Sequence, residues 1–309
     1  ASFNPGDISP TNFNMRKAQL IIFLIFALVI KVNAQKYKTS PHEIGFMVGM
    51  ANYMGDLSKS GDVAFFGDIQ AKAFRPAVGI FYRNNFYKFF NFRANLTIGQ
   101  VNGNDKYAPA KYGLQERNLH FRSNIKDVSL LIEWNIMPFK IAHYKYRFTP
   151  YLAGGVGGFY INPKAKLNGD WVALQALGTE GQGLLEYPDR TKYSKMNFSI
   201  PFGVGFKLNL GRLWCISAEM MYHYTFMDYI DDVSTSYPDF SYYYNNNVQA
   251  VADEANALSY RGDEALRESK IDTKRGNSAV NDHYFFIMIG ASVQISGGKT
   301  SCNTVRRGF

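Results

Sequence analysis

The chain has 309 residues, of which 46% are hydrophobic and 16% aromatic, a composition that excludes a disordered protein. Charged residues make up 19%, below the roughly 25% of an average soluble domain. The mean hydropathy of −0.22 excludes a bundle of membrane-spanning helices, but not a membrane β-barrel, whose strands alternate apolar and polar residues. The net charge of +9 comes from lysines and arginines spread along the chain. No nucleic-acid partner is therefore expected, whereas anionic lipid headgroups or an acidic partner remain as alternatives.

The first recognisable segment is an export signal. Basic residues follow Met15, an apolar run occupies residues 20–30, and the small-residue pattern Val32-Asn33-Ala34 follows. This order is typical of a secretory signal peptide, and the alternative is an amphipathic or buried helix. We predict an upstream extension at residues 1–14, a signal peptide at residues 15–34 and cleavage after Ala34.

Long segments of alternating apolar and polar residues follow the signal peptide. Within residues 90–98, one face carries Phe90, Phe92, Ala94, Leu96 and Ile98, as expected for a two-sided strand. Residues 198–210 repeat the pattern over more than the roughly 9–11 residues that cross a bilayer at a tilt. Six further segments alternate less cleanly, at residues 43–53, 75–85, 125–138, 147–162, 213–228 and 283–295. The sequence thus predicts an all-β fold, an up-and-down, eight-stranded antiparallel transmembrane β-barrel.

The connections between these segments alternate in length. Long connections lie at residues 55–74, 101–124, 163–195 and 229–282, and short ones lie near residues 84–89, 139–146 and 209–212. Outer-membrane barrels have short periplasmic turns and long outer loops. We therefore expect both termini in the periplasm and all four long loops outside, with a short helix within residues 248–266.

The lumen of an eight-stranded barrel is just wide enough to be filled by side chains. The inward faces are predicted to carry Glu43, Arg83, Arg93, Glu133, Lys207, Glu219 and His223. We expect structural ion pairs between Arg93 and Glu133 and between Lys207 and Glu219. A conducting pore is the weaker alternative, because open channels need 16–18 strands. Several aromatic residues near strand ends suit either interfacial girdles or the core, namely Tyr82, Trp134, Tyr151, Trp214 and Tyr224.

Motifs for catalysis and metal binding are missing from the sequence. No Gly-x-Ser-x-Gly, His-x-Glu-x-x-His or Cys-x-x-Cys pattern occurs, so we expect no enzymatic activity, cofactor or metal site. A lipid-modifying enzyme centred on His223, with Ser217, Glu219 and Thr225 near it, remains an alternative. The start of the fourth loop is acidic, with Asp228, Asp231, Asp232 and Asp239. Because the spacing lacks the register of a calcium loop, a solvated acidic loop is favoured over a cation site.

Several stretches resemble a known family. They are residues 117–119 (RNL), 121–123 (FRS), 147–151 (RFTPY), 159–165 (FYINPKA), 178–183 (GTEGQG), 187–189 (YPD) and 228–234 (DYIDDVS). They are similar to an outer-membrane β-barrel family of Bacteroidota that is catalogued as a domain of unknown function and includes PorG, the barrel component of the type IX secretion machinery. The outer-loop motif comprises Tyr187, Pro188, Asp189, Asp228, Asp231 and Asp232. Met227 and an insertion at residues 242–274 depart from the family pattern.

The resemblance implies an integral protein of the Gram-negative outer membrane with no catalytic residues. It also implies association with a periplasmic ring, formed by a lipoprotein and its partner, near the secretion translocon. A leftover cysteine in an exported protein suggests intermolecular pairing. Cys302 is therefore expected to form a disulfide with the ring lipoprotein, with an unpaired thiol as the alternative. Arg306 and Arg307 could add a charge contact or be part of a solvated tail.

The sequence therefore predicts a barrel at residues 35–297 and a periplasmic tail at residues 298–309. The barrel is expected to contact outer-membrane lipids and to act by binding, as a scaffold or accessory subunit that anchors the ring of a type IX secretion system. Two alternatives stay open: a lipid-modifying enzyme, and a surface-binding or adhesion barrel without a secretion role.

Overall fold

The computed structural model describes residues 42–57, 71–108, 114–140, 145–210 and 214–295, which all lie within one compact unit, Thr39–Phe309. The predicted upstream extension, signal peptide and periplasmic tail lie outside these residues, as does part of the short connection expected near residues 209–212.

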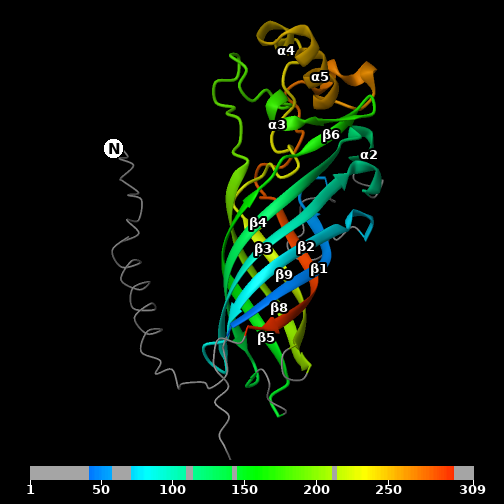
Figure 1. Cartoon of the computed structure of the whole chain (residues 1–309). Coiled ribbons are helices and arrows are strands. Elements are labelled where there is room, and N and C mark those ends of the chain that lie inside the picture. The colour runs from blue at the N-terminus through cyan, green and yellow to red at the C-terminus, as the bar shows by residue number, and fades with distance from the viewer. Residues whose placement is uncertain (1–41, 58–70, 109–113, 141–144, 211–213, 296–309) are drawn as a thin grey trace, which may run out of the picture. The chain divides into compact units, whose positions relative to one another are not determined.

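Eight long strands form the wall of a barrel, whose shape can be followed in Figure 1. They are β1 (His42–Met54), β2 (Arg75–Asn84), β3 (Phe90–Asn104), β4 (His120–Asn135), β5 (Phe148–Tyr160), β8 (Met196–Leu210), β9 (Trp214–Thr225) and β10 (His283–Gln294). All eight predicted segments are strands, because each one presents an apolar row to one side and polar or small residues to the other.

The sheet closes on itself. Each long strand pairs antiparallel with the strands before and after it in the chain, and β1 pairs with β10 from Glu43↔Gln294 to Met54↔His283. The order β3-β2-β1-β10-β9-β8-β5-β4, together with the β3–β4 pairing, leaves no open edge in the wall. The fold is a closed, up-and-down, eight-stranded antiparallel barrel, as the sequence predicts.

The long connections carry the remaining elements. These are the strands β6 (Lys164–Leu167) and β7 (Asp170–Ala173), the helices α2 (Leu114–Arg117), α3 (Leu174–Leu177), α4 (Tyr242–Asn246) and α5 (Gln249–Ser259), and the 3₁₀ helices η1 (Ala71–Ala73), η2 (Asp105–Tyr107), η4 (Glu264–Leu266) and η5 (Glu268–Lys270). Helix α5 lies within the segment predicted to be helical. None of the helices in the described ranges is long and apolar enough to cross a membrane.

The long connections fold into a cap, which we define as described residues 55–57, 71–74, 105–119, 161–195 and 226–282. Figure 1 shows α3, α4, α5 and β6 gathered at one end of the barrel. Buried apolar side chains of the cap, such as Ile230, Tyr243 and Leu258, share one core with lumen residues such as Phe159 and Phe286. The cap is therefore a continuation of the barrel interior.

The structure corrects one expectation and selects between two alternatives for Tyr151. The β3–β4 hairpin continues through Asn104↔His120, so the predicted loop at residues 101–124 is shorter, and its ends extend the barrel wall. Tyr151 does not belong to an outer girdle, because it is 1% exposed and lies inside the barrel. Its parity along β5 gives the reason, since it shares a face with the inward Thr149 and Ala153.

Candidate functional site

The lumen near the short connections is filled by charged side chains. Strand alternation turns Glu43, Arg83, Arg93, Glu133, Lys207, Glu219 and His223 inward, and all are buried, as predicted. An ionised group in such surroundings is stable only when an opposite charge and hydrogen bonds compensate it.

Glu133 is the centre of this lumen network. Its carboxylate lies 3.1 Å from Arg83, 3.1 Å from Arg93 and 2.6 Å from Lys207, and it also accepts a 3.1 Å hydrogen bond from Asn91. The structure thus contains the predicted contact between Arg93 and Glu133. The network contains three carboxylates and three cations, because Glu43 contacts Arg83 at 3.3 Å and Glu219 contacts Arg93 at 2.5 Å.

The predicted ion pair between Lys207 and Glu219 is wrong. Lys207 contacts Glu133 rather than Glu219, and Glu219 instead accepts hydrogen bonds from Arg93 and from Tyr151. The register explains the difference, because Lys207 lies opposite Ser217 whereas Glu219 lies opposite Gly205. Lys207 and Glu219 lie on the same β8–β9 hairpin, but this did not decide the pairing. The lumen is narrow, so Lys207 reaches Glu133 on the far side.

A second polar group lies deeper in the barrel, around His223. Its Nδ1 lies 3.3 Å from Asp127 and 3.5 Å from the Ser199 hydroxyl, while the Tyr284 hydroxyl donates a 2.9 Å hydrogen bond to Asp127. The adjoining cavity has a volume of about 10 Å³, room for about one water molecule. Because one ring nitrogen faces both groups, the ring cannot relay a proton from Ser199 to Asp127 as in a catalytic triad.

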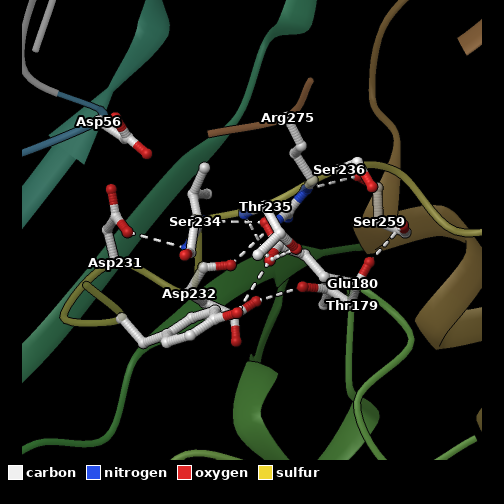
Figure 2. A network of polar contacts seen from close by, with 12 residues as sticks. Asp56, Thr179, Glu180, Asp231, Asp232, Ser234, Thr235, Ser236, Ser259 and Arg275 are labelled. Atoms are coloured by element: carbon white, nitrogen blue, oxygen red, sulfur yellow. Dashed lines mark hydrogen bonds and ion pairs between the residues drawn. The ribbon is translucent and has the colours of Figure 1, made fainter. Parts of the chain in front are cut away.

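The cap is held together by a third polar network, shown in Figure 2. Glu180, from the β5–β8 connection, accepts hydrogen bonds at 2.9 Å from the backbone N–H groups of Ser234 and Thr235. Arg275 donates to Glu180 at 3.1 Å and to the Asp232 carbonyl at 2.6 Å. Burial opposes the charge of Arg275, yet Glu180 and Asp232 raise its pKa above the ordinary value. This network ties the two longest connections to each other.

The acidic start of the fourth loop is buried, which corrects the expectation of a solvated loop. Asp232 accepts hydrogen bonds from Thr179 and Tyr193, and burial raises its pKa to about 6 although Arg275 opposes the rise. Asp231 and Asp282 both accept from the Tyr53 hydroxyl. Burial, reinforced by neighbouring carboxylates, raises the pKa of both well above the ordinary value.

Asp228 lies in the same cluster and is also buried. Both of its carboxylate oxygens are shielded from solvent. Burial raises its pKa to about 8, and the charges of Asp56 and Glu180 add to the rise, whereas Ser234 and Lys274 lower it. A buried carboxylate that Ser234 and Lys274 compensate only in part is more stable when it is protonated.

The other predicted site residues lie apart. The Tyr187 hydroxyl accepts a 2.9 Å hydrogen bond from the Asp239 backbone in the cap, while Pro188 and Asp189 are exposed. Cys302, Arg306 and Arg307 lie outside the described residues. In the part of the chain that the structure describes, no group of three or more histidine, cysteine or acidic side chains is arranged to hold a metal ion.

Sequence reasoning missed the residues that organise the cap, chiefly Glu180, Arg275 and Asp282. Glu180 lies in one of the family-like stretches, and the glycines around it at positions 178, 181 and 183 are a signal of a tight, specific turn. Arg275 and Asp282 carried no comparable signal, because their partners are 95 and 52 residues away in the chain.

We predict that Glu133→Gln destabilises the barrel by about 3–5 kcal/mol, because three buried cations lose their shared counter-charge. The measurement is the free energy of urea unfolding in detergent micelles, followed by tryptophan fluorescence. The double variant Glu133→Gln/Lys207→Met is the matched control, since it removes one cation together with the carboxylate, and it should be more stable than Glu133→Gln alone. Equal stability of Glu133→Gln and the wild type would contradict the assignment.

We also predict that the cap loses stability as the pH rises from about 4 to about 8. In the folded chain Asp228 stays protonated up to a pKa of about 8, against an ordinary value of 3.8. Between these values the unfolded state binds fewer protons, so the free energy of unfolding falls with pH. Asp228→Asn should flatten the dependence of the thermal midpoint on pH, whereas the exposed control Asp189→Asn should not. An identical slope in Asp228→Asn and the wild type would refute this.

Comparison with solved structures returns small bacterial surface barrels. The chain is similar to the neisserial surface protein A NspA (8% identity, TM-score 0.38, covering 84% of this chain and 100% of that one). It is also similar to the outer membrane protein OprG from Pseudomonas aeruginosa (12% identity, TM-score 0.37, covering 83% of this chain and 98% of that one). A third similar structure is that of the attachment invasion locus protein Ail of Yersinia pestis, in complex with a heparin analogue (10% identity, TM-score 0.35, covering 82% of this chain and 96% of that one).

A search of the curated proteins finds no match. The family model described as a domain of unknown function, DUF6089, matches residues 17–253, well over half of the chain. The protein belongs to the DUF6089 family.

Proposed function

We propose that this protein is an integral outer-membrane barrel that works by binding, as a scaffold or accessory subunit of a type IX, PorG-like secretion system. In this proposal the cap faces outward and the short connections face the periplasm. In the periplasm, the short connections and the tail at residues 298–309 hold the ring lipoprotein and its partner.

The observation that carries the membrane location is the apolar outer wall. Outward rows of Phe, Ile, Leu, Val and Met run along the strands, and many of these side chains are about half exposed, for example Ile289 at 65% and Phe206 at 53%. Water-soluble proteins rarely expose a contiguous apolar surface larger than a few hundred Å². Hydrocarbon suits this surface, because the closed ladder leaves no unpaired strand edge to be solvated.

The filled lumen supports a binding role over transport. Glu133 and its three cations occupy the end with the short connections, and the cap core continues into the lumen at the other end. The cavity beside His223 has room for a water molecule and not for a lipid substrate. The surfaces that remain for function are therefore the cap, the outer wall and the periplasmic connections.

The secretion role is proposed from the stretches that resemble the family containing PorG. Some of these stretches lie in the organised cap, where residues 178–183 and 228–234 supply Glu180 and one of its backbone partners, Ser234. The same residues that carry the resemblance thus fix the shape of the cap, which is expected of a subunit that offers a defined surface to a partner.

The membrane location predicts a contrast between two exposed apolar residues. Ile289→Arg places a charge in the outer wall and should destabilise the barrel in lipid vesicles by about 2–4 kcal/mol. Leu185→Arg is the matched control, because Leu185 is 86% exposed but lies in the cap, and it should change stability by less than about 0.5 kcal/mol. The measurement is urea unfolding in phosphatidylcholine vesicles. Equal effects of the two substitutions would show that the wall does not face lipid.

The scaffold role predicts that the tagged full chain recovers the ring lipoprotein from detergent-solubilised outer membranes. A chain ending at residue 297 should recover much less, and on non-reducing gels Cys302→Ser should lose any disulfide-linked band.

Deletion of the gene should abolish export of secreted cargo. Expression of the His223→Asn variant in the deletion strain should restore export if no catalysis is involved. Normal export after deletion, with no ring protein recovered, would exclude the secretion role and leave the surface-binding alternative.

A further inference from the structure

One part of the outer surface carries cations without counter-charges. Arg122 and Lys126 lie on the outward face of β4, while Lys164 and Lys166 lie on one face of β6. The pairing Arg122↔Lys164 places two cations directly opposite each other, an arrangement that is destabilising unless an anion lies between them. We name these four residues the basic face.

The acidic residues of the same strands lie elsewhere. Asp127 and Glu133 of β4 face the lumen. Asp170 of β7 pairs with Leu167, and it therefore lies on the other side of the β6–β7 hairpin from Lys166. Within the described ranges, no ion pair joins any residue of the basic face to a carboxylate. The missing counter-charge points to a ligand outside the chain.

Aromatic rings hold two of the cations in place. The guanidinium of Arg122 lies 3.7 Å from the centroid of the Trp171 ring, and the Lys126 ammonium lies 5.7 Å from that of Tyr160. Stacking uses the flat face of a guanidinium and leaves its in-plane N–H groups directed outward. These groups donate to no residue in the described part of the chain, so they are available for the bidentate contact that a phosphate accepts.

The basic face lies directly beyond the apolar wall. Lys126 is the next outward residue after Val128, which is 55% exposed, and the two are about 7 Å apart along the strand. This step carries Lys126 into the headgroup layer, which extends about 5–8 Å beyond the hydrocarbon. Arg122 lies about 13 Å farther along β4 than Lys126, more than a single small phosphodiester can span.

We propose that the basic face binds a membrane lipid whose headgroup is a phosphorylated saccharide, on the side of the membrane that faces the cap. The saccharide spans the distance from Lys126 to Arg122 and Lys164, and its phosphates supply the missing counter-charge. This inference rests on the membrane location proposed above, since it places the basic face at headgroup depth.

The test uses the full chain folded in neutral detergent micelles and titrated with lipopolysaccharide, phosphatidylglycerol or phosphatidylcholine, with tryptophan fluorescence as the readout. Each cation near a lipid surface contributes roughly a fivefold change in affinity. Arg122→Gln/Lys126→Gln/Lys164→Gln should therefore weaken lipopolysaccharide binding on the order of 100-fold. Replacing three cap lysines outside the basic face, Lys192, Lys270 and Lys274, by Gln is the control for net charge and should have little effect.

The outcomes separate the two proposals. Preference for lipopolysaccharide over phosphatidylglycerol, lost in the first triple variant and kept in the second, supports the basic face. Equal loss in both triple variants, or equal affinity for the two anionic lipids, overturns it while leaving the membrane location intact. Failure of the wild type to fold into phosphatidylcholine vesicles, judged by identical gel mobility with and without boiling, overturns both proposals. Unchanged circular dichroism of the variants shows that they fold.

Discussion

Charge compensation inside the lumen is the constraint on which the rest of the barrel depends. Eight strands enclose a space that side chains must fill, and a strand with an apolar outer row presents its other row to that space. Glu133 lies where three cations, one each from β2, β3 and β8, can reach it. Removing charges from water costs several kcal/mol per ion unless partners replace the water. The register of the sheet is therefore tied to the lumen network, since a slip by one residue would turn these groups toward the outer wall.

The cap is subject to the same constraint, because its buried polar groups also need partners or protons. Its apolar core continues into the upper lumen, so the connections cannot be solvated loops, and their acidic residues are enclosed with them. The charge of Glu180 is compensated by two backbone N–H donors and by Arg275. The cluster around Tyr53 solves it differently, by holding protons on neighbouring carboxylates. A cap built in this way presents a fixed outer shape, which suits recognition of a partner.

The sequence was sufficient for the wall and insufficient for the cap. A period of two is a local signal, so all eight strands could be located, and the inward set from Glu43 to His223 followed from parity alone. Pairing inside the lumen depends on how strands tilt and on which side chains meet across the barrel, and for that reason Lys207 was assigned the wrong carboxylate. The burial of Asp231 and Asp232 depends on contacts with Tyr53, Thr179 and Arg275, between 43 and 178 positions away, which no local pattern encodes.

The pairing of β1 with β10 has a consequence for how the chain is made. Barrel closure joins strands that are separated by nearly the whole described sequence, so the last strand to leave the ribosome is also the one that seals the wall. Until it arrives, the hydrophobic rows and two strand edges are exposed, a state that is prone to aggregation. Long-range pairing of this kind is also intrinsically slow. A chain that lacks β10 therefore leaves the facing edges of β1 and β9 without their partner strand, and its barrel cannot close.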